Sequence, residues 1–386
     1  QRGLSAHGPP YVLVDATVTR WNDAPAHAAV LLIAHGAGWT DLLPGQRLQL
    51  RGRLERPRSG DGLSAVLLAA GTPKLVGRPP WWQRVAGYVR ARLRQACSGL
   101  PPDARGLVPG LVVGDVSAMP ASLTAAFRTS GLTHLNAVSG ENCAIVLATV
   151  AAVLRRTLLR RGWRYALSAT ALVSFVVLAR PSPSVLRAAV MGGAALAAGA
   201  AGRRSQPVPL LAGAVLLLLL VDPFLARAPG FALSVLATAA IVVGARPLAG
   251  ALSRRLPRPV ATAIAVPAVA QVACTPVLVV VFGQLSPWAV PANLLAAPAV
   301  APATVVGVTA AIVATVLLPV AAALSWAAAL PAAWLAFVAR GFAALPGANA
   351  RPAPAVLLLP VALLVISVAW RRRSSRLHEM LGAWPP

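Results

Sequence analysis

The chain is poor in acidic residues and has almost no lysine. Lysine and arginine together number 35 against 10 aspartates and glutamates, which gives a formal net charge of +25, and Lys74 is the only lysine. Charged residues make up only 12% of the chain, about half of the roughly 25% found in an average soluble domain. With 57% hydrophobic residues, this composition excludes an ordinary soluble enzyme and indicates a polytopic membrane protein.

Cysteine frameworks and catalytic motifs are also missing. Cys97, Cys143 and Cys274 are too few for a disulfide framework, and we expect them to be apolar fillers. The sequence contains no phosphate-binding Gly-x-x-x-x-Gly-Lys-Ser/Thr loop, no His-Glu-x-x-His pair and no Gly-x-Ser-x-Gly elbow around Ser139. We therefore expect no catalytic residues, no metal and no cofactor. Because the chain begins at Gln1 without a methionine, we expect it to lack its natural N-terminus.

Residues 1–76 differ from the rest of the chain. Four pieces separated by glycine, proline and aspartate have strand character: Tyr11–Thr19, Ala28–Ala34, Leu48–Leu54 and Ala65–Ala70. They predict a small antiparallel β-barrel of the OB-like kind, in which Gly52 relieves crowding at a bend.

A short amphipathic helix is expected within residues 77–105. Trp81–Ala96 mixes paired tryptophans and four arginines with aliphatic residues, which is typical of a helix lying on the surface of a bilayer. An ordinary connector helix would give the same pattern.

From Leu135 onward the apolar runs approach the ~20 residues needed to cross a membrane. We predict about nine spans, one of them broken or re-entrant because Pro287, Pro291, Pro298 and Pro302 interrupt it. The predicted spans are Leu135–Leu154, Trp163–Leu178, Val185–Ala201, Val208–Val221, Phe231–Ala245, Val260–Phe282, a crossing within Trp288–Leu318, Val320–Leu345 and Ala355–Trp370.

Arginine clusters follow the first, third, fifth and last of these predicted spans. They lie at 155–164, 203–204, 246–258 and 371–373, and alternating spans would bring them all to one side. By the positive-inside rule that side is cytoplasmic, so residues 1–76 are expected outside.

The membrane part resembles the ComEC/Rec2 family of competence proteins, inner-membrane channels for DNA uptake in natural transformation. Its motifs occur in the expected order. They are Phe127-Arg128 with Gly131–Leu135 and Ser139-Gly140, then Pro183–Met191, then Asp222–Phe224 with Gly230–Thr238, and last Gln271, Thr275-Pro276, Ser286-Pro287 and Asn293–Pro298.

The resemblance implies a transmembrane competence domain at 106–370, followed by a basic cytoplasmic tail at 371–386. It implies a cytoplasmic-membrane channel that passes single-stranded DNA inward, with an outer DNA receptor, a separate nuclease and a cytoplasmic ATPase as partners beside the lipid bilayer. The sequence does not decide whether the chain forms a homo-oligomer. Many members read Leu-His where this chain has Glu141-Asn142, so no role of that histidine carries over. The alternative function is a secondary transporter of a small anion, which predicts inverted repeats, and the sequence has no convincing internal repeat.

Polar residues near the apolar runs are the candidates for lining a DNA path, because ionisable groups at a span are costly unless they face protein or water. Alternatives remain for several of them: Glu141 and Asn142 in interfacial water, Arg187 snorkelling outward, and Thr275-Pro276 as a packing kink. The candidates are His134, Ser139, Gly140, Glu141, Asn142, Arg187, Asp222, Gln271, Thr275, Pro276 and Asn293.

The OB-like domain offers a second set of candidates, which would bind single-stranded DNA through cations and stacking aromatics. Arg47, Arg51 and Arg53 alternate with leucines and would share a solvent face. A merely solvated strand face is the alternative. The full set is Arg20, Trp21, Trp39, Arg47, Arg51 and Arg53.

Overall fold

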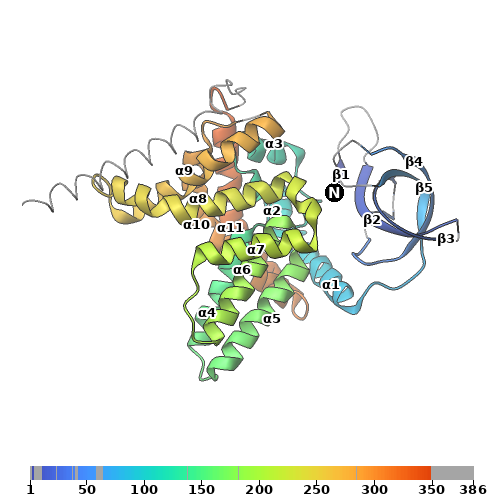
Figure 1. Cartoon of the computed structure of the whole chain (residues 1–386), viewed down its shortest axis with the longest axis horizontal. Helices are drawn as coiled ribbons and strands as arrows, with labels where there is room; N and C mark the ends of the chain where they lie inside the picture. Colours follow the sequence, from blue (N-terminus) through green and yellow to red (C-terminus); the bar gives the residue numbers. More distant parts are fainter. Residues whose placement is uncertain are drawn as a thin grey trace, which may run out of the picture.

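The fold, seen in a computed structural model, consists of a small sheet and a larger helical part (Figure 1). Helix α1 lies between them and leads from one to the other (Figure 1). The structure describes residues 2–3, 11–22, 24–36, 38–39, 42–57, 64–136, 138–180, 182–283 and 285–348.

The sheet has four long strands and a two-residue edge strand, in the order β1-β2-β3-β5-β4. All neighbours pair antiparallel except β3 and β5, which run parallel. The prediction of an antiparallel sheet was therefore wrong for the pairing of β3 with β5. Strand β5 lies between β3 and β4, parallel to β3 and antiparallel to β4. Within the described residues β4 and β1 are the sheet's open edges, so a closed barrel is not seen. The strands are β1 (Arg2–Gly3), β2 (Tyr11–Trp21), β3 (Ala24–His35), β4 (Leu48–Glu55) and β5 (Ala65–Leu75).

A compact apolar core lies under this sheet. Leu32, Ala34 and Leu67 pack around Trp39, which is 2% exposed and donates its indole N–H to the carbonyl of Gly71 at 3.1 Å. Strand β4 approaches β5 closely at Gly52, where a Cβ would lie 2.4 Å from the carbonyl oxygen of Leu68. Glycine is therefore required at the position where the sequence predicted a bend.

Helix α1 crosses the ends of two long helices. Arg90 donates to the carbonyls of Val177 and Leu178 at the end of α5, and Arg92 donates to the carbonyl of Ala314 at the end of α10. Cations at helix C-termini satisfy orphan carbonyls and the macrodipole. These bonds fix α1 across the helical part. The first helices are α1 (Trp81–Ala96), α2 (Pro102–Val113), α3 (Ala121–Thr129) and the 3-10 turn η1 (Thr133–Leu135).

Each of the first eight predicted spans contains an α-helix, and the ninth, Ala355–Trp370, lies outside the described residues. Six helices are long and apolar enough to cross a membrane, namely α5, α6, α8, α9 with η3, α10 and α11, while α7 is a shorter apolar helix. The helices are α4 (Gly140–Arg155), α5 (Arg161–Ala179), α6 (Pro183–Ala200), α7 (Pro207–Val221), η2 (Pro223–Arg227), α8 (Pro229–Leu252), α9 (Arg258–Val277), the π-helical turn η3 (Leu278–Phe282), α10 (Ala289–Val313) and α11 (Leu318–Ala343).

The predicted break in the seventh span is not seen, because α10 is one helix of 25 residues with Pro298 and Pro302 inside it. A proline inside a helix costs about 3 kcal/mol, and the packing of α10 offsets this cost. Its buried face is rich in alanine, including Ala292, Ala296 and Ala303, and lies in the main core with α2 and α11. The chain instead turns at Gly283, which follows η3 with φ of 62°.

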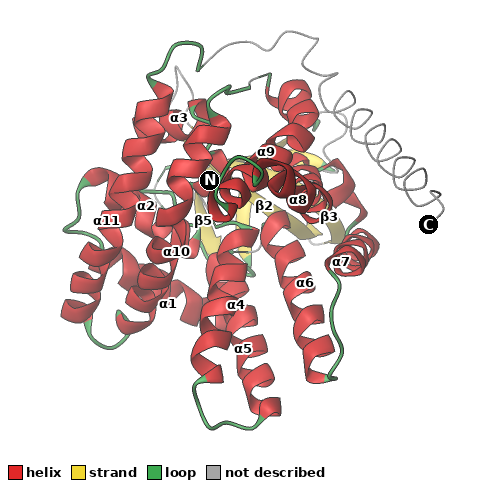
Figure 2. Cartoon of the chain, turned by 90° about the vertical axis from the view of Figure 1, so that its left-hand side faces the viewer, coloured by secondary structure: helices red, strands yellow, loops and turns green. Residues whose placement is uncertain are grey.

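The contacts of α1 with two helix ends contradict a strict alternation of all the spans across the membrane. Alternation would put the C-terminal ends of α5 and α10 at opposite membrane faces, yet Arg90 and Arg92, two residues apart, bind one end each. Helices α8 and α9 also lie across α4, α5 and α6 instead of parallel to them (Figures 1 and 2). Two arginine clusters can therefore be assigned to the same side of the membrane only where the packing of the helices brings them to the same end of the helical part.

One such place is the far end of α5. Arg161 donates to the carbonyl of Gly199 at 2.6 Å, and the ring of Tyr165 lies against Gly199. The loop 156–160 and the residues after α6, including Arg203, are thus at the same end. Helix α5 has 19 residues, or roughly 28 Å at 1.5 Å per residue, and α1 lies at its other end.

Packing at Gly307 gives a testable expectation. A Cβ there would lie 2.4 Å from Cγ2 of the buried Val112, whereas a Cβ at Gly193 of α6 would meet nothing within 4 Å. Gly307→Ala should destabilise the protein by about 1–3 kcal/mol through overpacking, while Gly193→Ala should be neutral or stabilise it by up to ~1 kcal/mol through helix propensity. Thermal unfolding of the detergent-solubilised chain measures both, and equal shifts in Tm would contradict the close contact of α2 with α10.

Candidate functional site

Arg187 is a buried cation where α4, α6 and α8 meet. It is 7% exposed, its Nε donates to Oγ of Ser234 at 2.9 Å, and its Nη1 lies 3.2 Å from Sδ of Met191. The interpretation that Arg187 snorkels outward is therefore wrong, because its head group is satisfied inside the protein. Its suggested partners Glu141 and Asp222 are both exposed, and neither forms an ion pair among the described residues.

The start of α4 packs directly on this arginine. A Cβ at Gly140 would lie 3.2 Å from Nη2 of Arg187, from Cβ of Ala188 and from the carbonyl oxygen of Ser184. Only glycine lets the two helices approach this closely without displacing their neighbours. The Ser139-Gly140 pair is thus placed against the Arg187 turn of α6.

Two buried polar atoms at the start of α4 have no hydrogen-bond partner. Asn142 is 1% exposed and donates through Nδ2 to the carbonyl of Leu111 at 2.9 Å, but its Oδ1 is unpaired. Oγ of Ser139 is also buried and unpaired, although Ser139 stands at the N-cap position, where such an oxygen normally accepts a backbone N–H. Unpaired buried acceptors are expensive, so this helix start is held in a costly arrangement.

The turn that carries His134 lies against the start of α10. His134 lies near Asn293, whose Nδ2 donates to the carbonyl of Ala289 at 2.8 Å. Gly131, with φ of 79°, brings the preceding turn against this helix start, since a Cβ there would lie 2.6 Å from Cβ of Ala289. The turn with the motif Gly131–Leu135 therefore lies against the start of the helix that carries the motif Asn293–Pro298.

The end of α9 adds the remaining buried candidates. Thr275 is 2% exposed and donates to the carbonyl of Gln271 at 2.7 Å, and Cys274 donates to the carbonyl of Leu233 in α8 at 3.5 Å. Two residues after Pro276, at Leu278, the helix widens into the π-helical turn η3. A π-turn interrupts the ordinary hydrogen-bond ladder, and an opening for a DNA path and a packing kink would both give this geometry.

The structure thus groups the candidates unevenly. Ser139, Gly140, Asn142 and Arg187 surround the start of α4, which we call the α4 mouth. His134 with Asn293, and Gln271 with Thr275 and Pro276, form two further contacts.

Glu141 and Asp222 are not drawn into these contacts. Asp222 accepts the backbone N–H of Phe224 at 3.0 Å and so acts as a helix cap. Ser234 was missed because a lone hydroxyl one turn into an apolar helix gives little signal. No group of three or more histidine, cysteine or acidic residues in the described part of the chain could hold a metal ion.

In the sheet, Arg47, Arg51 and Arg53 are exposed while Leu48 and Leu50 pack on the core. Arg20 and Trp21 are exposed at the end of β2. Trp39 departs from the expectation: it fills the core of the sheet, where no base can stack on it.

A family model described as "Competence protein" matches residues 111–374, which contain the α4 mouth and both further contacts. The chain belongs to the competence protein family. It is 30% identical to ComE operon protein 3 of Bacillus subtilis (strain 168) over 213 residues, which are 54% of this chain and 27% of that protein. The chain thus spans about a quarter of the length of this curated relative. No solved structure matches.

The α4 mouth of this competence protein allows a matched pair of substitutions. Asn142→Ala removes the bond to Leu111 and should cost about 1–3 kcal/mol. Ser139→Ala deletes a buried hydroxyl that has no partner, so the free energy of unfolding should stay the same or rise by up to about 1–3 kcal/mol. Thermal or denaturant unfolding of the purified chain compares the two, and a large loss for Ser139→Ala would mean that its hydroxyl is bonded.

Proposed function

We propose that this chain forms the membrane part of a channel that passes single-stranded DNA into the cytoplasm during natural transformation. One observation carries the proposal: within the residues matched by the competence family, the start of α4 packs through Gly140 on the buried cation Arg187 and also carries the unpaired buried acceptors of Ser139 and Asn142. Buried polar groups in an apolar helical protein are typical of substrate pathways. Hydroxyl, amide and guanidinium groups can form hydrogen bonds with a solvated DNA strand and its phosphates.

Transport rather than catalysis is the proposed activity, and the energy comes from a partner or a gradient. An outer DNA receptor, a separate nuclease and a cytoplasmic ATPase would complete the system. The exposed arginines of β4 would meet the strand first, through a contact that does not depend on sequence.

Deletion of the gene in a naturally transformable host tests this function. Transformation should fall to the background rate while labelled DNA still binds at the cell surface, because the receptor acts before the channel. Expression of the deleted chain from a second locus should restore transformation. Parental transformation in the deletion strain would exclude the DNA channel and favour a small-anion transporter.

The proposed orientation places the sheet outside the cytoplasmic membrane. The arginine-rich loop 156–160 is at one end of α5, and α1, which leads directly from the sheet, is bound to the other end. By the positive-inside rule the arginine-rich end is cytoplasmic.

Cysteine labelling tests this orientation. Lys74→Cys on β5 and Arg160→Cys are both at exposed positions. With a membrane-impermeant maleimide on right-side-out spheroplasts, Lys74→Cys should react and Arg160→Cys should react only after the membrane is opened. The unsubstituted chain, whose cysteines are buried or half-buried, is the control, and external labelling of Arg160→Cys would reverse the orientation.

A further inference from the structure

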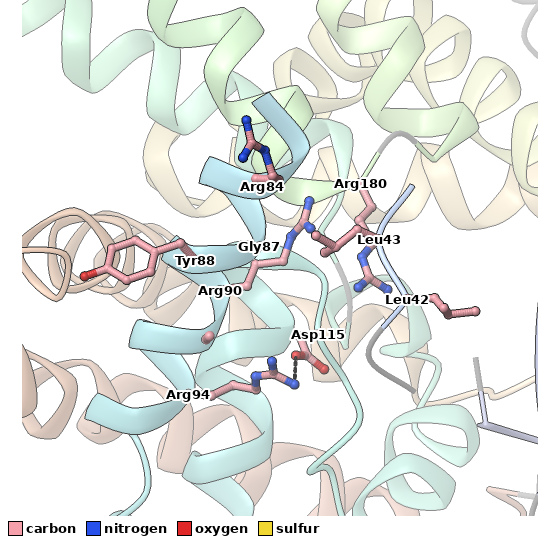
Figure 3. A pocket seen from close by; sticks show the side chains of 10 residues that line it. Leu42, Leu43, Arg84, Gly87, Tyr88, Arg90, Arg94, Asp115 and Arg180 are labelled. Carbon is pink, nitrogen blue, oxygen red and sulfur yellow. Dashed lines mark ion pairs between the residues drawn. The ribbon is translucent and has the colours of Figure 1, made fainter. Parts of the chain in front are cut away.

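A cleft of about 330 Å³ lies where the sheet domain meets the helical part. Leu42 and Leu43, which precede β4, form one wall, and α1 forms another (Figure 3). The charged lining consists of four arginines and one carboxylate: Arg84, Arg90, Arg94, Arg180 and Asp115. The competence motifs do not include this cleft.

Arg90 is the deepest cation in the cleft. It is 2% exposed, and its Nε and Nη2 bind the carbonyls of Leu178 and Val177 at 2.9 and 2.8 Å. Its Nη1 is buried without a partner. Burial, and then the nearby Arg180, lower the pKa of Arg90 to about 10, so the group keeps its charge at neutral pH. A buried N–H donor of a cation that has no acceptor is costly, and an anion in the cleft would supply one.

The single carboxylate of the cleft is already engaged. Asp115 lies 3.6 Å from Nη1 of Arg94 and accepts the backbone N–H of Ser117 at 3.1 Å. Burial raises the pKa of Asp115, but the bonds from Ser117 and the charges of Arg94 and Arg180 outweigh it and hold that pKa below its usual value. Asp115 thus offsets one arginine, and Arg84, Arg90 and Arg180 leave the cleft positive.

Arg180 is held in a strained backbone conformation. Its φ is 60° and its ψ is 120°, a region that L-residues other than glycine rarely adopt. Glycine would remove the strain at this position, directly after α5. A strained residue whose exposed cation lies near Arg90 and lines the same cleft is typical of a position that serves binding.

The geometry points to a binding site for a backbone phosphodiester of the DNA strand, formed by Arg180, Arg90 and Arg84 between the sheet and the membrane part. Two observations favour a strand over a lipid headgroup. The apolar wall comes from Leu42 and Leu43 of the sheet domain, and the basic strand β4 begins just after them, with the backbone of Arg47 bonded to Val76 in the linker to α1. The cleft would therefore continue the row of phosphate contacts that begins on β4. This inference rests on the proposed function.

The test uses the full chain in nanodiscs of phosphatidylcholine, with a fluorescent oligothymidylate as the probe. Arg180→Gly removes the cation and relieves the strain, so the protein should remain at least as stable while its affinity for the probe falls about fivefold to tenfold at low salt. The slope of log K against log salt should fall by about 1. Arg180→Gln should weaken binding similarly without relieving strain.

Two matched controls separate charge from strain. Arg105→Gln removes an exposed arginine outside the cleft, and Asn22→Gly relieves the other non-glycine residue with a positive φ, 46°, in the part of the chain that the structure describes. Neither should reproduce the loss. Unchanged affinity and slope in both Arg180 variants would overturn the site.

Further arms distinguish the other outcomes. If Arg51→Ala with Arg53→Ala weakens binding but the Arg180 variants do not, the proposed function survives and the cleft site fails. If the unsubstituted chain binds no probe at low salt, the proposed function itself is in question. If the Arg180 variants bind the probe normally but retain less phosphatidylglycerol from mixed vesicles, the cleft is a lipid site and the inference is wrong.

Discussion

The meeting of α4, α6 and α8 depends on satisfying the buried charge of Arg187. A guanidinium inside an apolar bundle is stable only where donors, acceptors and close packing replace water. Ser234 on α8 supplies an acceptor, Met191 a soft neighbour, and Gly140 the space that lets α4 approach. Each comes from a different place in the sequence, so the charge ties α4, α6 and α8 into one unit.

Helix α1 does a comparable task at the border between the two parts. It buries one face, which includes Ala86, Leu93 and Ala96, while Trp81 and Trp82 are exposed at its N-terminal end. Its polar side is not merely solvated, because its arginines bind the carbonyl ends of α5 and α10. The helix therefore fixes the ends of two membrane-spanning helices while leading directly to the sheet. A change in the position of the sheet would be transmitted to those ends through α1.

Several features were predictable from the sequence because they follow from local pattern. The four long strands, the helix at Trp81–Ala96 and a helix within each of eight apolar runs all appear, since periodicity and apolar length are local properties. The burial of Arg187 and Trp39 was not predictable, because it depends on partners such as Ser234 and Gly71 that are distant in sequence. Burial also decided how each behaves: Arg187 does not snorkel, and Trp39 is a core residue and not a stacking platform.

The errors in the helical part have a common physical cause. The prolines predict a break in α10, but a buried face of alanine packs tightly enough to keep the helix continuous through Pro298 and Pro302. Alternation of spans was assumed from arginine clusters, which report side only if each helix crosses in turn. Both rules describe isolated helices, and here contacts between helices override them.

The same contacts explain why α1 carries arginine and not lysine at positions 90 and 92. Arg90 uses two nitrogens to bind two successive carbonyls at the end of α5, and its third nitrogen, Nη1, is buried without a partner. A lysine ammonium is a single, strongly hydrated point and could not hold two carbonyls in a fixed plane while presenting a separate donor. Arg92 likewise binds Ala314 and Gln95 through different nitrogens. Arginine is therefore required wherever a cation must cap a helix end and retain a free donor, whereas orientation by positive charge alone would accept either residue.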